Sequence, residues 1–209
     1  VENIDKLIEL EVERQKKLVE LGEELDSESE VLGDNVTHVF EDTTNEIVST
    51  VIENDGAVYA LKLPGMTGKM KQKISGDRYV AKELVDYARN QGPRGIIHTD
   101  EDITGYGLEK EFEELGETFK KDEEDVIAII AAPERQAKNA AQEVQTRAEM
   151  LYEGKVPEET RAAEQDFTSS YSRPLPGAAR MYPETDIPAI EVSDERIDEI
   201  DQNLPETLD

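Results

Sequence analysis

The sequence predicts an α+β protein: a compact middle region of about four short strands and four helices, flanked by a long helix and an extended proline-rich ribbon. Apolar residues recur at helical spacing in several blocks, and short runs of strand-forming residues lie between these blocks. Hydrophobic residues make up 36% of the 209-residue chain, enough to bury a core despite an acidic composition. The alternation of the two patterns therefore places the middle of the chain in one mixed domain.

The chain opens on an amphipathic helix. In NIDKLIELEVERQKKLVELGEEL, residues 3–25, apolar side chains such as Ile4 and Leu7 recur mostly every three to four positions. An acidic linker at 22–34 follows, with six acids and no base, and a solvated segment is the simplest interpretation of such a run. After the linker, THVF at 37–40 predicts a short strand.

Strands and helices then alternate. Thr43 and Glu46 stand at capping-box spacing and predict the start of a helix that stops at Gly56. Strands are expected at 57–64, 94–99 and 125–133, and helices at 77–92, 107–120 and 133–154. Residues 65–76 form a glycine-bounded loop, and Pro133 stands at a favoured first position of the last helix.

These elements divide into three segments. The opening helix and acidic linker occupy 1–34, the middle domain 35–165, and a return ribbon with an acidic tail 166–209, leading towards a helical domain. The first and last segments look like two parts of a second domain into which the middle domain is inserted. Val1 in place of an initiator methionine predicts a segment of a longer protein.

Charge limits the possible partners. The chain carries 50 acidic and 23 basic residues, a formal charge of −27, which excludes a protein that holds nucleic acid mainly through a basic surface, and no DNA partner is expected. Such acidity is typical of proteins from salt-loving cells. The absence of cysteine excludes disulfides and thiolate metal sites and favours a cytoplasmic protein. Because no apolar run approaches the ~20 residues that a membrane helix needs, no membrane partner is expected either.

One basic island stands out in this acidic chain. Lys69, Lys71 and Lys73 lie in the glycine-bounded loop, with Lys62 nearby. They are candidates for contact with the phosphate backbone of an RNA, although three charges supply modest, salt-sensitive affinity. Offsetting the local acidity is the alternative interpretation.

The stretch GIIHTDED, 95–102, delivers polar side chains to the end of an expected strand. A histidine beside carboxylates is typical of a metal or acid–base site. Neighbouring strand residues face opposite ways, however, so His98 and Thr99 cannot share a site without a turn. A structural role, with Asp100 capping the turn, is the favoured interpretation.

Motifs of self-contained enzymes are missing. GMTG and GPRG lack the strand, GxGxxG and helix order of a dinucleotide site, and GxxxxGK[ST] does not occur. TSSYS offers hydroxyl groups without a nearby histidine, so the sequence does not indicate a Ser-His-Asp catalytic triad. We therefore expect no catalytic residue and no metal ligand in this chain.

The ribbon SRPLPGAARMYPETDIPAI, residues 172–190, balances two arginines against two acids and carries four prolines. Proline fixes φ and biases the preceding residue to extended geometry, so the ribbon holds its charged side chains in defined directions. Such an arrangement suits the wall of a cleft, where arginine recognises phosphate or carboxylate. A strap between domains with surface ion pairs, including Arg173, is the alternative.

Several words of the sequence resemble one family. RPLPGAARMYPETDIPAI is similar to the end of the catalytic cradle in the E subunit of archaeal glutamyl-tRNA(Gln) amidotransferase, and IELEVERQ looks like the cradle helix before its insertion. Between them, VTHVF, ALKLPGMTG, RGIIHTDEDITGYGL and NAAQEV with RAEML resemble the insertion domain shared with bacterial-type aspartyl-tRNA synthetase. The resemblance covers nearly the whole chain, and its blocks occur in the family's order.

The resemblance implies a part of a cytoplasmic ligase that works with the D subunit of the amidotransferase and amidates glutamate mischarged on tRNA(Gln). It implies ATP and Mg in the full enzyme but none in this segment, which should be inactive alone. By position in the strongest family word, the candidate cleft-lining residues are Arg180, Tyr182, Glu184 and Asp186. The alternatives are a free-standing acidic tRNA-binding or scaffold module, and the insertion domain of an aspartyl-tRNA synthetase.

Overall fold

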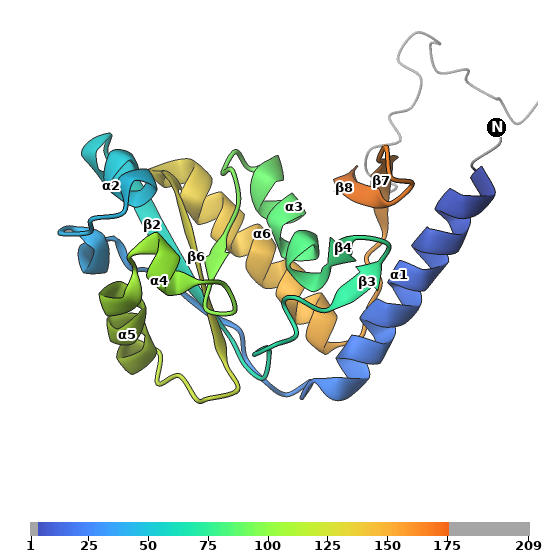
Figure 1. Cartoon of the computed structure of the whole chain (residues 1–209), viewed down its shortest axis with the longest axis horizontal. Coiled ribbons are helices and arrows are strands. Elements are labelled where there is room, and N and C mark those ends of the chain that lie inside the picture. The colour runs from blue at the N-terminus through green and yellow to red at the C-terminus, as the bar shows by residue number, and fades with distance from the viewer. Residues whose placement is uncertain (1–3, 176–209) are drawn as a thin grey trace, which may run out of the picture. The chain divides into compact units, whose positions relative to one another are not determined.

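The computed structural model describes residues 4–175, and a four-stranded antiparallel sheet forms its centre (Figure 1). In the sheet the strands follow the order β1 (Leu32–Asn35), β2 (Gly56–Leu63), β6 (Val126–Pro133) and β5 (Ile97–His98). β2 and β6 are the longest pair and stay in register from Gly56 opposite Pro133 to Leu63 opposite Val126. Two further two-stranded sheets pair β3 (Lys73–Ser75) with β4 (Arg78–Tyr79), and β7 (Glu159–Ala163) with β8 (Ser169–Pro174).

Helices cover both faces of the central sheet and confirm the expected α+β class. They are α1 (Ile4–Glu24), α2 (Glu46–Glu53), α3 (Val80–Asn90), α4 (Ile103–Tyr106), α5 (Glu109–Thr118) and α6 (Glu134–Tyr152), with a 3-10 helix η1 at Thr37–Phe40. None of the helices in residues 4–175 has the length and apolar character needed to span a bilayer.

The sequence of strand β6 is apolar without interruption because both of its faces are buried. Val126, Ala128 and Ile130 pack into a core shared with α1, α3 and α6. Ile127 and Ile129 pack on the opposite face, into a second core with η1, α2 and α5. A strand buried on both faces cannot alternate between apolar and polar residues, even in an antiparallel sheet.

The expected strand at 37–40 is wrong. Residues Thr37–Phe40 form η1, and the edge strand is instead β1, within the stretch expected to be a solvated linker. The Asn35 side chain accepts hydrogen bonds from the backbone and hydroxyl of Thr37, while Thr37 Oγ1 accepts one from the Val58 backbone at 3.0 Å. These side-chain bonds end the strand pairing and turn the chain. β1 itself is fully exposed, so no burial pattern marks it in the sequence.

Two helix starts also differ from expectation. Asn45, not Thr43, caps α2, because its side chain accepts from the backbone N–H groups of Ile47 and Val48. Pro133 ends β6 and occupies the cap position of α6 with ψ of 136°, so the helix begins one residue later. The short elements α4, β3, β4 and the β7–β8 hairpin were not expected from the sequence either.

Helix α1 packs closely on the end of α6. A Cβ built on Gly22 would lie 2.2 Å from the Gly154 Cα, so only glycine permits this approach. The buried α1 residues Leu18 and Leu21 pack into the same core as α3 and α6. The boundaries expected at 34/35 and 165/166 stay predictions, and most of the proline-rich ribbon lies outside the described residues.

A buried cluster of ion pairs holds α1, α3, α6 and β7 together. The Glu83 carboxylate on α3 is paired with Arg14 on α1 at 2.8 Å and with Arg147 on α6 at 3.1 Å. Burial by itself raises the pKa of Glu83, but Arg147 and Arg14 outweigh it and lower the pKa to about 2. Arg161 on β7 also pairs with Glu83, at 3.4 Å, and with Glu159 beside it. One carboxylate thus joins segments far apart in the sequence.

Candidate nucleic-acid interface

The loop that follows β2 carries the basic island. Gly65 and Gly68 adopt positive φ values of 66° and 78°, which favour glycine and allow two tight turns. The Asp100 carboxylate accepts hydrogen bonds from the backbone of Gly68 at 2.8 Å and of Met70 at 3.3 Å. The Met70 carbonyl in turn accepts from the Ala81 backbone at the start of α3. The middle of the loop is thereby fixed to the rest of the domain.

The polar stretch after β5 forms two successive turns. The Thr99 hydroxyl accepts from the Ile127 backbone and extends the pairing with β6. The Glu101 backbone donates to the His98 carbonyl, and the Asp102 side chain then caps α4 by accepting from Gly105. The expectation that Asp100 caps the local turn is therefore wrong: Asp102 caps it, and Asp100 instead accepts hydrogen bonds from the backbone of the neighbouring lysine loop.

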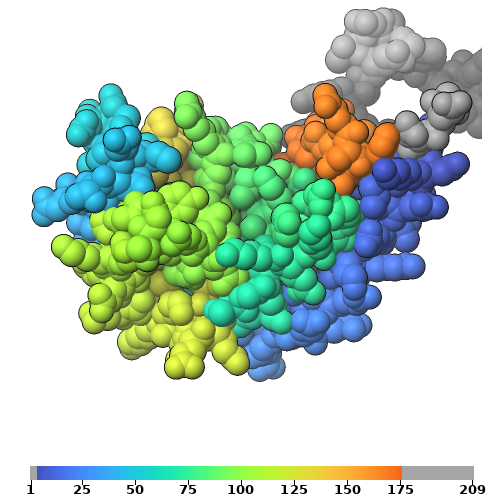
Figure 2. Space-filling model, viewed as in Figure 1, coloured from blue at the N-terminus to red at the C-terminus, as the bar shows by residue number. Residues whose placement is uncertain are grey.

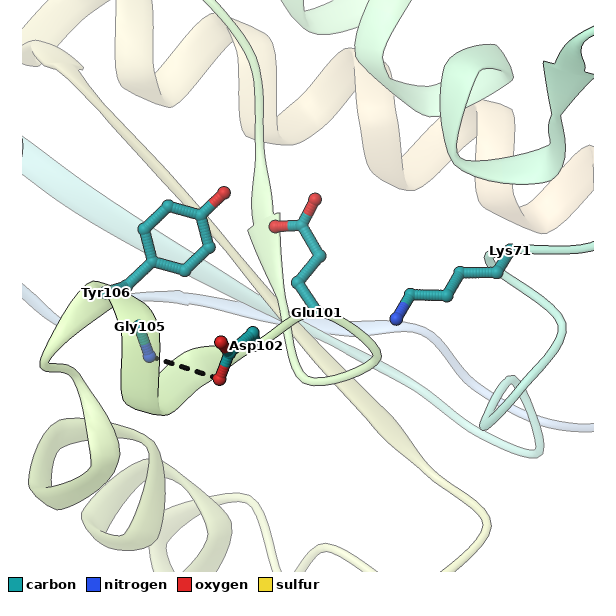
Figure 3. A pocket seen from close by; sticks show the side chains of 5 residues that line it. All are labelled: Lys71, Glu101, Asp102, Gly105 and Tyr106. Atoms are coloured by element: carbon teal, nitrogen blue, oxygen red, sulfur yellow. Dashed lines mark hydrogen bonds between the residues drawn. The ribbon is translucent and has the colours of Figure 1, made fainter.

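These two segments meet on one face of the molecule, where Figure 2 shows the 69–79 and 99–107 surfaces side by side. A pocket of about 380 Å³ lies between Lys71 on one side and Glu101, Asp102, Gly105 and Tyr106 on the other (Figure 3). We call it the Tyr106 pocket. In Figure 3 the Lys71 side chain reaches across from the loop towards the acids.

A second, larger pocket of about 470 Å³ shares Lys71 and Glu101 with the first, and we call it the Lys71 groove. Its lining residues are Met70, Lys71, Tyr79, Ala81, Lys82, Val85, Arg89, Gly95, Ile96, His98 and Glu101. Lys82, Val85 and Arg89 follow helical spacing on one side of α3, so a single helix face supplies one wall. The groove combines an apolar interior with charged side chains.

The charge of the Lys71 groove is opposite to that of the whole chain. Three cations, Lys71, Lys82 and Arg89, face one carboxylate, Glu101. Within residues 4–175 no ion pair within 4.0 Å involves any of these three cations. Lys82 and Arg89 also border a third pocket, of about 500 Å³, which contains several acids. The groove nevertheless offers positive charge that no close carboxylate neutralises.

His98 is a buried residue at the floor of the groove. Its exposed fraction is 3%, and burial lowers its pKa, against the opposing effect of Glu101 and Asp100. His98 Nε2 is 3.8 Å from Glu101 Oε1, too far for a hydrogen bond. Within the described residues, His98 Nδ1 and Glu101 Oε2 are both buried without a hydrogen-bond partner. The charge of Glu101 also raises the pKa of the neighbouring Tyr106.

The structure separates the three lysines of the basic island. Lys69 is paired with Glu24 on α1 at 2.8 Å, and Lys73 is paired with Asp77 at 2.7 Å. Only Lys71 lines the groove. The structure thus does not bring the three together in one site, and their role in tRNA contact stays a prediction.

Sequence reasoning missed several groove residues. Lys82 and Arg89 stand seven residues apart on an expected helix, and this spacing alone could have indicated a shared face. Tyr79 in the groove carried no such signal, and neither did Tyr106 in the adjacent Tyr106 pocket, because each stands alone in its segment. The candidate cleft-lining residues of the ribbon lie outside the described residues: Arg180, Tyr182, Glu184 and Asp186.

The side chains of the groove offer chemistry suited to binding. Among residues 4–175 no group of three or more histidine or acidic side chains is placed to hold a metal ion. Sites for single-stranded nucleic acid combine cations with an exposed aromatic side chain, and the groove has both, with Tyr79 as the aromatic residue. The site therefore fits a local polynucleotide contact on an otherwise acidic surface.

Comparisons with known proteins place the groove within a region that matches a known family. Residues 48–141 match the GAD domain model, a range that contains every residue of the groove. The E subunit of glutamyl-tRNA(Gln) amidotransferase from Methanopyrus kandleri is 41% identical over 211 residues, covering 97% of this chain and 33% of that protein. The corresponding E subunits of Haloarcula marismortui and Pyrococcus abyssi are 43% and 42% identical, covering 91% and 96% of this chain and 31% and 32% of those proteins.

The chain spans about a third of the length of the curated relatives it matches. These matches include the opening helix and the ribbon as well as the middle domain, so they do not favour a free-standing module or a synthetase insertion. They confirm the resemblance that the sequence carries: nearly the whole chain is similar to one third of the E subunit of archaeal glutamyl-tRNA(Gln) amidotransferases, and its residues 48–141 match the GAD family.

Proposed function

We propose that this chain is part of the E subunit of an amidotransferase, which works with a D subunit in the cytoplasm and converts Glu-tRNA(Gln) to Gln-tRNA(Gln). The identity of 40–43% to archaeal E subunits over more than nine-tenths of the chain supports this proposal. The formal charge of −27 supports a salt-loving host, in which an acidic surface keeps the protein soluble.

ATP and Mg would act elsewhere in such an enzyme. The described residues offer neither a glycine-rich phosphate loop nor a group of acids placed to hold a metal ion. They do not fit an ATP–Mg site, so no chemical step is assigned to them. On its own, the chain should therefore lack transamidation activity.

The role that the geometry supports for this segment is tRNA contact through the Lys71 groove. The observation that carries it is a groove whose three cations have no close carboxylate partner, in a chain with more than twice as many acids as bases. Phosphate neutralisation by a few such cations gives modest affinity that falls with salt. The groove would orient a tRNA that other parts of the enzyme bind more tightly.

The test is a charge reversal in the full complex of the E and D subunits. Lys71→Glu should weaken tRNA binding about uniformly across sequences and reduce the slope of log K against log salt by about 1. Lys138→Glu makes the same charge change on the exposed surface of α6, outside the groove, and is the matched control. Equal affinity and equal salt slope for the two variants would remove the groove from the tRNA interface.

A further inference from the structure

The Lys71 groove has features that a contact with double-stranded phosphates alone does not need. Its interior is lined by Met70, Val85 and Ile96, which are apolar, and it is bounded by Tyr79, whose exposed fraction is 37%. Base stacking on an exposed aromatic ring is a main source of affinity for unpaired nucleotides. A volume of about 470 Å³ is in the range of pockets that hold one small flat group.

The charged side chains are placed to hold a phosphate at the edge of this interior. Lys82 and Arg89 line one side of the groove on α3, and Lys71 approaches from the loop. Tyr79 is the residue directly before α3, so the aromatic residue is adjacent in the chain to the helix that carries two of the cations. A nucleotide could therefore place its base against the ring and its phosphate against the cations.

Two buried polar atoms beneath the groove also indicate that a ligand binds there. His98 Nδ1 and Glu101 Oε2 have no hydrogen-bond partner in the described residues, and leaving buried polar atoms unpaired is costly. The Glu101 side chain is 32% exposed, so turning it would bring its carboxylate into the groove and uncover the imidazole. An ionised carboxylate only accepts hydrogen bonds, so it favours a ligand that carries N–H donors.

We propose that the Lys71 groove binds one unpaired nucleotide, with its base stacked on Tyr79, its phosphate held by Lys71, Lys82 and Arg89, and an amino group of its base bound by Glu101. This inference rests on the proposed tRNA contact and makes it specific. Adenine, cytosine and guanine carry an exocyclic amino group and uracil does not. An amino group offers two N–H donors to the carboxylate, whereas uracil offers only the single N–H of its ring, so the groove should prefer the first three bases.

The experiment measures fluorescence anisotropy of labelled RNA pentamers on the full complex of the E and D subunits. Oligo-A and oligo-C should bind more tightly than oligo-U, by about tenfold if one hydrogen bond to a charged group is gained. Tyr79→Ala should weaken binding of all three pentamers by about tenfold through lost stacking, whereas Tyr79→Phe should keep native affinity.

Glu101→Gln tests the selectivity. It should reduce the preference for oligo-A and oligo-C over oligo-U, with Glu113→Gln, an exposed position on α5, as the matched control. Equal affinity of the native complex for all three pentamers, or equal behaviour of Tyr79→Ala and Tyr79→Phe, would overturn the inference. If Lys71→Glu still weakens tRNA binding in that case, the broader tRNA contact stands and only the nucleotide pocket is lost.

Discussion

Replacing Glu83 by glutamine removes the negative charge at the centre of the buried ion cluster while keeping the size of the side chain. Glu83 is 1% exposed and accepts hydrogen bonds from Arg14 at 2.8 Å, and from Arg78 and Arg147 at 3.1 Å. Within the described residues Arg147 has no other ion pair, and its Nε and Nη1 atoms already lack hydrogen-bond partners. The substitution therefore leaves a fully buried guanidinium without a counter-charge.

The lowered pKa and the typical cost of breaking a buried ion pair give similar values for the stability that this substitution removes. A carboxylate whose pKa falls from 4.5 to about 2 on folding stabilises the native state by about 3 kcal/mol at neutral pH. Removing one partner of a buried ion pair typically costs about 3–5 kcal/mol, because the remaining charge stays buried and unpaired. We expect Glu83→Gln to lower the free energy of unfolding by about 3 kcal/mol.

The assay is urea denaturation at pH 7, followed by far-ultraviolet circular dichroism. Replacing Arg147 by methionine in the same chain should remove the stranded charge, so Glu83→Gln should cost at least about 1 kcal/mol less in that background. Glu113→Gln is the control for loss of a surface carboxylate and should change stability by less than about 0.5 kcal/mol. A cost of Glu83→Gln below about 1 kcal/mol, or strict additivity with Arg147→Met, would refute the reasoning.

Two further predictions concern pH and packing. The pKa values of Glu83 and Glu11 are both lowered to about 2 in the folded chain. The stability that these two carboxylates contribute should therefore be complete above about pH 5 and be lost as the pH falls towards 2. A urea midpoint that stays constant between pH 5 and pH 3 would contradict this. Gly22→Ala should destabilise the chain by about 1–3 kcal/mol, because its Cβ would meet the Gly154 backbone. Gly116→Ala, in the last turn of α5 with nothing within 4 Å of the added Cβ, should stabilise the chain by about 0.5 kcal/mol. An equal effect of the two substitutions in thermal unfolding would exclude close packing as the cause.

The helices and strands that bury a regular set of positions could be predicted from the sequence. The long β2 and β6 strands and the α3, α5 and α6 helices follow the apolar periodicity of the sequence, because each buries one continuous face or both. The failures occur where local polar bonds decide the backbone. The hydrogen bonds of Thr37 with Asn35 and Val58 favour a 3-10 helix at 37–40, where the residue types predict a strand. Asn45 caps α2 in place of the expected Thr43.

The candidate site was predictable only in part. The basic island directed attention to Lys71 and the GIIHTDED stretch to His98 and Glu101, but nothing in the sequence joined the two. Asp100 joins them by accepting hydrogen bonds from the backbone of the lysine loop, a contact 32 residues apart in the chain. Such a contact leaves no periodic signal, because its partners are backbone N–H groups rather than side chains.

The sequence by itself determined the α+β class, the acidic surface, the absence of cysteine chemistry and the resemblance to the amidotransferase family, because these depend on composition, local periodicity and short words. Only the tertiary structure decided which lysine lines a groove and which ones are paired with acids. It alone placed Tyr79, Lys82 and Arg89 beside Lys71 and buried Glu83 among four arginines. The physical reason is that long-range pairing depends on which surfaces remain uncovered once both faces of the central sheet are packed.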